Sequence, residues 1–118
     1  MAIHITSNTK SATLTPTSKD ELTSIIMEEI KRQGPDADLN FIDTSLITDM
    51  SFLFVWVGIR NIKIDEWDVS NVTNMDKMFS GCKEFSCDLS KWDVSNVKYH
   101  RFMFDNFHID DAYKPKFK

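Results

Sequence analysis

Two cysteines and two histidines are the side chains whose spacing could support metal chemistry in this 118-residue chain. Cys82 and Cys87 form a Cys-x4-Cys pair, and His100 and His108 follow them in the sequence. Four such ligands could bind zinc. A zinc-binding sequence usually carries a second, matching ligand pair, which this chain lacks, so the spacing favours two reduced thiols, one of them buried. We therefore predict no metal ion and no cofactor.

The acidic residues do not form a recognisable catalytic group either. An aspartate recurs every 25 residues and is followed two positions later by a serine, at Asp43, Asp68 and Asp93 and at Ser45, Ser70 and Ser95. A residue that recurs in this way serves the scaffold, because a catalytic residue is needed only once. Short polar side chains bond the nearby backbone and hold tight turns. Without a visible triad or a glycine-rich phosphate loop, the sequence predicts a protein that is not an enzyme.

These positions belong to a longer unit that repeats every 25 residues. Residues 67–72 (WDVSNV) return unchanged at 92–97, and a divergent copy lies at 42–47. The alignment extends to a phenylalanine in every copy, at Phe54, Phe79 and Phe104. A fixed period of this length is typical of stacked repeats, in which each unit buries its apolar face against the next. We expect the three phenylalanines to form a column in the interior.

Each copy is predicted to contain a short helix and an extended segment. In the second copy Thr73 is a candidate N-cap, and Met75 and Met78 would lie on one helical face. Gly81 is placed to end this helix. Residues 85–92 would then return the chain in an extended conformation to the next copy.

The run at residues 67–79 (WDVSNVTNMDKMF) resembles the BspA-type bacterial surface protein repeat, a relative of the leucine-rich repeats with a unit of about 26 residues. The resemblance covers about residues 39–105. It implies a right-handed solenoid with a binding or adhesion role and without catalytic residues. The expected fold class is therefore α+β: a short right-handed leucine-rich-repeat-like solenoid of about three 25-residue repeats with an N-terminal capping helix.

The strongest helix signal covers residues 18–33. Ser18 and Glu21 form a capping-box pattern, and Gly34 with Pro35 ends the helix. An apolar stripe runs along it at Leu22, Ile25, Ile26 and Ile30. We expect this helix to cover the open end of the stack, and recognition of a partner is the alternative.

The whole chain is expected to form one structural domain in three parts. Residues 1–38 are the N-terminal arm and capping helix, in which alternation between Ile3 and Leu14 suggests a hairpin or else a loose arm. Residues 39–105 are the three repeats. Residues 106–118 are a C-terminal tail or cap, whose alternating lysines could touch phosphate or an acidic partner but more often form a solvated end.

The composition restricts the function further. A net charge of −4 argues against a general nucleic-acid binder, which usually carries a basic patch. The first fifteen residues lack the apolar core of a signal peptide, and no apolar run approaches the length of a membrane span. The sequence alone therefore predicts a cytoplasmic protein without membrane contact.

The leading hypothesis is a non-enzymatic protein–protein interaction module with an unidentified protein partner. Candidate partner-binding residues are those that vary between the copies or lie outside the conserved positions, namely Lys77, Lys83, Glu84 and Phe102. Trp56 joins them if it is exposed, because it lies in the most apolar run of the chain. Two alternatives are a small inhibitor of a host or defence enzyme, encoded by a phage or mobile element, and a cell-surface adhesion or host-binding protein. An incompletely covered end could also pair with a second copy to form a homodimer.

Overall fold

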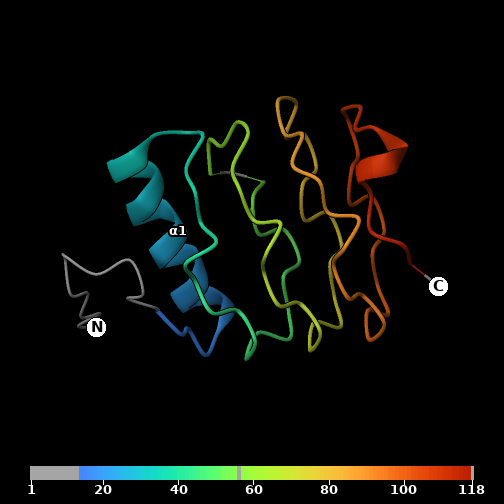
Figure 1. Cartoon of the computed structure of the whole chain (residues 1–118), viewed down its shortest axis with the longest axis horizontal. Coiled ribbons are helices and arrows are strands. Elements are labelled where there is room, and N and C mark those ends of the chain that lie inside the picture. The colour runs from blue at the N-terminus through green and yellow to red at the C-terminus, as the bar shows by residue number, and fades with distance from the viewer. Residues whose placement is uncertain (1–13, 56, 118) are drawn as a thin grey trace.

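The computed structural model describes residues 14–55 and 57–117. These residues form one α-helix, α1 (Lys19–Gln33), and one short 3-10 helix, η1 (Asp111–Tyr113). The remaining described backbone consists of turns, bends, segments without regular structure and four isolated parallel β-bridges, Leu14–Ile42, Asp38–Lys63, Asn74–Asp49 and Asn74–Tyr99. In Figure 1, α1 lies along one end of the body and η1 at the other, with the irregular segments side by side between them.

The predicted α+β class and leucine-rich-repeat-like solenoid are wrong. Among the described residues the β-bridges are single pairs, so they build neither a strand nor a sheet. Residues 85–92 form no strand: residues 85–89 have no regular secondary structure, and a turn follows at residues 90–91. The structure is a compact body of 38 × 27 × 22 Å, in which one helix packs against irregular chain.

The helix predicted after Thr73 is absent for a reason that the backbone makes clear. A helix would pair each N–H with the carbonyl four residues earlier. Instead the N–H groups of Met75, Lys77 and Phe79 donate to a neighbouring segment, to the carbonyls of Tyr99, Arg101 and Met103 at 2.6, 2.9 and 3.0 Å. Lys77 also has a φ of 54°, which an α-helix does not accommodate.

The helix predicted at residues 18–33 is confirmed as α1. The Ser18 side chain accepts a hydrogen bond from the Glu21 N–H at 3.2 Å, which satisfies one of the unpaired donors of the first turn. The N–H of Gly34 donates to the Ile30 carbonyl at 2.8 Å, with Gly34 at a φ of 95°. The apolar stripe faces the core, where Leu22, Ile25 and Ile26 are buried.

The recurring aspartates hold turns, as predicted. The carboxylates of Asp43, Asp68 and Asp93 accept hydrogen bonds from the backbone N–H two residues later at 3.0, 3.0 and 3.1 Å. In two of the copies the serine hydroxyl donates to the same carboxylate at 2.6 Å. These carboxylates therefore supply acceptors for backbone N–H groups that would otherwise be unpaired in the turn.

The predicted phenylalanine column is also confirmed. The ring centroids of Phe54 and Phe79 are 5.3 Å apart, and those of Phe79 and Phe104 are 5.6 Å apart with nearly parallel planes. Two tryptophans reinforce the contact between copies, since the Trp67 and Trp92 indoles donate to the carbonyls of Leu39 and Ile64 at 2.8 and 3.0 Å. The interior is thus built from equivalent side chains of the first copy (39–63), the second copy (64–88) and the third copy (89–105).

Hydrogen bonds between equivalent segments of these copies have a common direction. The N–H groups of Met50, Phe52 and Phe54 donate to carbonyls of the second copy at 2.9, 2.9 and 3.1 Å. The equivalent N–H groups of the second copy donate in the same way to the third. In these segments each copy therefore offers carbonyls toward the copy before it and donors toward the copy after it.

Glu29 makes the stability of the protein depend on pH. Glu29 is only 5 % exposed, and burial opposes ionisation of its carboxyl group. Hydrogen bonds from Arg32 and Gln33 outweigh that effect and hold the Glu29 pKa below its ordinary value. A depressed pKa gives a contribution that is complete above the unfolded-state pKa of about 4.3 and is lost as the pH falls through the folded-state value.

We therefore expect the native protein to be more stable than Glu29→Gln by about 1–2 kcal/mol at pH 6, because hydrogen bonds to a charged group are lost in the variant. The difference should shrink as the pH falls from about 5 to 3. Urea unfolding of both proteins at each pH measures it. A difference that stays constant over this range would contradict the assignment.

Candidate functional site

Phe52, Lys77 and Phe102 form a row on the surface, one residue from each copy and 25 positions apart. The Lys77 ammonium lies 5.8 Å from the ring centroids of both phenylalanines. Phe52 is 52 % exposed and Phe102 is 63 % exposed, so both rings present apolar surface to solvent. We call these three residues the aromatic row.

The backbone of the aromatic row is unusual. Phe52, Lys77 and Phe102 have φ values of 60°, 54° and 55°, in the left-handed region that non-glycine residues rarely adopt. Such a residue costs roughly 1–2 kcal/mol relative to a right-handed one. The conformation recurs at the same position of all three copies, so the neighbouring hydrogen bonds between copies hold it in place.

An ion pair lies beside the aromatic row. The Arg101 guanidinium contacts the Asp76 carboxylate at 2.8 Å and lies 5.7 Å from the Tyr99 ring centroid. The Arg101 N–H also donates to Asp76, at 2.7 Å. In the second copy the equivalent N–H donates to the Asn74 side chain, but the third copy has Tyr99 there, which cannot accept it in that way. Asp76 therefore takes over, and the Arg101 hydrogen bond lowers its pKa.

An open hollow of about 260 Å³ is lined by Phe52, Asp76, Lys77, Arg101 and Phe102. It presents two aromatic faces, one ammonium between them and a guanidinium that is already paired with a carboxylate. Exposed aromatic and arginine side chains of this kind are enriched at the energetically important centres of protein interfaces. The arrangement suits recognition of a surface rather than proton transfer.

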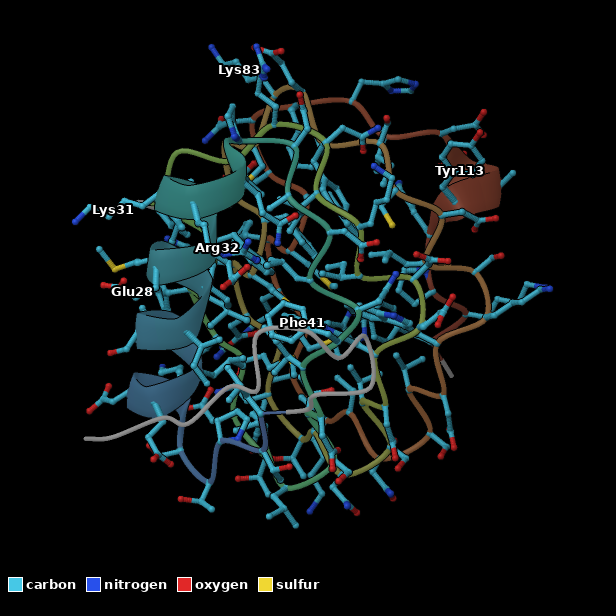
Figure 2. All side chains as sticks on the ribbon, turned by 60° about the vertical axis from the view of Figure 1, so that its left-hand side comes forward. Glu28, Lys31, Arg32, Phe41, Lys83 and Tyr113 are labelled. Carbon is cyan, nitrogen blue, oxygen red and sulfur yellow. The ribbon has the colours of Figure 1, made fainter. Side chains whose placement is uncertain are left out.

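The structure brings together two of the residues that the sequence singled out and leaves two apart. Lys77 and Phe102 share the aromatic row, whereas Lys83 and Glu84 line a separate hollow of about 230 Å³ with Gly58 and other residues. Lys83 points outward at one edge of the molecule (Figure 2). Trp56 lies outside the described residues.

Three further residues that line the site, Phe52, Asp76 and Arg101, were not candidates from the sequence, and neither was Tyr99 beside Arg101. The sequence did contain evidence for Phe52, because the alignment of the copies places it at the position of Lys77 and Phe102. A column that alternates between aromatic and cationic residues can form the contacts seen here. The sequence evidence for Arg101 was weaker. It lies in the replacement of Asp49 and Asn74, the polar residues of the first two copies, by Tyr99 in the third.

The cysteines and histidines of the sequence analysis are used differently. Cys82 is buried with its thiol 3.6 Å from the Phe54 carbonyl, and burial raises the pKa of that thiol to about 11. Burial also raises the pKa of Cys87. The His100 ring stacks on Phe117 at a centroid distance of 3.8 Å. Within residues 14–55 and 57–117, no three histidine, cysteine or acidic side chains are grouped to hold a metal ion.

One family model matches this chain, over residues 24–112, and its description is "Mycoplasma protein of unknown function, DUF285". No curated protein and no solved structure matches the chain. In the described part of the structure, no helix has the length and apolar character that a membrane crossing requires.

Proposed function

Because the chain belongs to the family of Mycoplasma proteins of unknown function called DUF285, whose model matches residues 24–112, we propose that it is a non-enzymatic module that binds another protein through the aromatic row. The observation that carries this proposal is the pair of exposed rings, Phe52 and Phe102, fixed on either side of Lys77. Neither ring belongs to the buried core, so both rings are available to a partner.

The backbone strain supports the same proposal. Left-handed conformations of bulky residues tend to occur where a structure maintains a functional surface at the expense of stability. Here three such residues lie at equivalent positions and two of them carry exposed aromatic rings. Rigid aromatic side chains lose little conformational entropy on binding, which makes them effective anchors for a partner.

The proposed absence of catalysis has support of a different kind. The recurring aspartates are occupied in turns, as Asp68 illustrates with its two hydrogen bonds from Ser70. The Cys82 thiol, with its pKa raised by burial, is a poor nucleophile at neutral pH. We further propose kinship with the BspA-type repeats, which the run at residues 67–79 supports.

The double variant Phe52→Ala/Phe102→Ala is expected to weaken partner binding by about 30-fold or more, because loss of interface anchors typically costs at least 2 kcal/mol. Leu46→Ala is the matched control, since Leu46 is a 53 % exposed apolar residue outside the aromatic row. Its affinity should remain within about threefold of the native value.

The partner would be recovered by affinity capture from the cell that produces the protein and identified by mass spectrometry. Titration of that partner with each variant then gives the affinities, and circular dichroism verifies that both variants are folded. The proposal would be rejected if capture recovers no specific protein, or if Leu46→Ala weakens binding as much as the double variant.

A further inference from the structure

The third copy ends the stack with unpaired backbone donors. The N–H groups of His100, Phe102 and Phe104 are equivalent to those that pair the first copy with the second and the second with the third. Within the described part of the chain these three N–H groups have no acceptor. His100 and Phe102 are exposed and Phe104 is half-buried, so the segment 100–104 forms an open edge accessible to a partner.

The opposite end of the stack is closed. There the free groups are carbonyls, and the Lys19 ammonium of α1 donates to the Ser51 carbonyl at 3.2 Å and to the Ser51 hydroxyl at 3.1 Å. The ammonium also lies 3.5 Å from the Asp49 carboxylate. In a head-to-tail dimer, the first repeat of a second molecule would have to offer its carbonyls to the open edge. The helix α1 covers those carbonyls. This geometry argues against a head-to-tail pair of identical chains.

The residues after the third copy cover only part of the open end. The Leu89 N–H donates to the Tyr113 carbonyl at 2.8 Å, which repeats the bond from Leu39 to Lys63 two copies earlier. Phe117 then stacks on the His100 ring. Between this tail and the segment 100–104 lies a hollow of about 350 Å³, lined by His100, Phe102, Met103, Phe104, Asp105, Lys114, Pro115 and Phe117.

The end of the phenylalanine column lies at the same place. Phe54 and Phe79 are 1 % and 0 % exposed because each is covered by the next copy, whereas Phe104 is only half-buried. The Phe104 ring contacts Phe107 edge-on at 6.0 Å, and the Lys114 ammonium lies 5.9 Å from its centroid. One face of the column therefore lacks the stacked ring found between the copies.

We propose that the open edge binds a turn-forming segment of a partner protein that offers backbone carbonyls at residues i, i+2 and i+4, a left-handed residue at i+3 and an aromatic side chain at i+5, as residues 99–104 do. The template is the third copy itself, whose Tyr99, Arg101 and Met103 carbonyls accept bonds and whose Phe104 stacks on Phe79. Pairing of a peptide backbone with exposed backbone groups of a protein is a common mode of peptide recognition. This inference rests on the proposed interaction function but uses the backbone N–H groups of residues 100–104, including that of Phe102, rather than the side chains of the aromatic row.

The test uses the whole chain labelled with ¹⁵N and a peptide with the sequence of residues 72–81 (VTNMDKMFSG), which contains the required carbonyls and phenylalanine. In the free protein, the His100, Phe102 and Phe104 amides should exchange with solvent at least about 100-fold faster than those of Met75, Lys77 and Phe79. Addition of the peptide should shift the three fast amides in a saturable manner and slow their exchange by about tenfold or more.

A control peptide with serine in place of its phenylalanine should bind at least about tenfold more weakly, since it cannot extend the column. The inference is overturned if the three amides are already protected in the free protein, or if about 2 mM peptide leaves them unshifted. It is also overturned if the control peptide binds equally well. A native partner that is still captured through the aromatic row would then leave the proposed function standing, so the two failures are distinguishable.

Discussion

Replacement of Phe79 by alanine is expected to lower the free energy of unfolding by about 4 kcal/mol, the usual cost of emptying a large buried aromatic site. Phe79 is fully buried and stacks on Phe54, Phe85 and Phe104 at centroid distances of 5.3, 4.3 and 5.6 Å. Because Phe54 and Phe104 belong to the first and third copies, the cavity cannot collapse without changing how the copies are packed together. Urea unfolding followed by tryptophan fluorescence measures the change.

The matched control is Phe104→Ala, at the equivalent position of the third copy. Phe104 is half-buried and lacks a stacked ring on its outer side, so its loss should cost only about 1–2 kcal/mol. Equal losses for the two variants would show that the column is not the main contact between the copies.

Trp92 gives the second large effect, and two substitutions separate its causes. Trp92→Ala should cost about 4 kcal/mol through the cavity that it leaves. Trp92→Phe keeps most of the ring but removes the bond from the indole to the Ile64 carbonyl, and should cost about 1–2 kcal/mol. The smaller value follows because the Ile64 carbonyl retains the N–H of Trp67 at 3.1 Å.

The same unfolding measurement applies to both Trp92 variants, with near-ultraviolet circular dichroism as a check on the remaining packing. If Trp92→Phe costs as much as Trp92→Ala, the hydrogen bond contributes more than the ring, and packing is not the main role of this residue. The ring centroids of Trp92 and Phe79 are 6.4 Å apart. The losses of stability from Trp92→Ala and Phe79→Ala should therefore not be additive.

The 25-residue period was sufficient to predict which side chains meet in the core. Phe54, Phe79 and Phe104 recur at equivalent positions, and only a column can bury all three against one another. The aspartate turns were predictable for a related reason, because the side chain of Asp68 bonds its own neighbourhood and depends on no distant contact. The helix α1 followed from its own capping residues and apolar stripe.

Secondary structure inside the copies could not be predicted in this way. The apolar spacing of Val72, Met75 and Phe79 suits a helical face, but it equally suits an irregular segment whose side chains are buried by adjacent copies. The choice is made by backbone bonds to residues about 25 positions away, which override local preference. The left-handed φ of Lys77 carries no sequence signal, since lysine has no preference for that region.

The candidate site was predictable only in part, for the same reason. Lys77 and Phe102 attracted notice because they differ between copies, and so did Lys83 and Glu84, which line another hollow. Variation marks residues that the core does not require but does not reveal which of them are neighbours. That information comes from the stacking of the copies, which brings Phe52 within reach of Lys77.

The hydrogen bonds that join residues 50–54, 74–79 and 99–103 share one direction, which has a consequence for how such a protein can change in size. Donors on one side of each copy match carbonyls on the other, so a duplicated block of 25 residues inserted between the second and third copies would find both sets of partners in place. An insertion of any other length would shift Phe79 and the aspartate turns out of register with their neighbours. Genetic gain or loss in this molecule should therefore be tolerated mainly in whole units of that length.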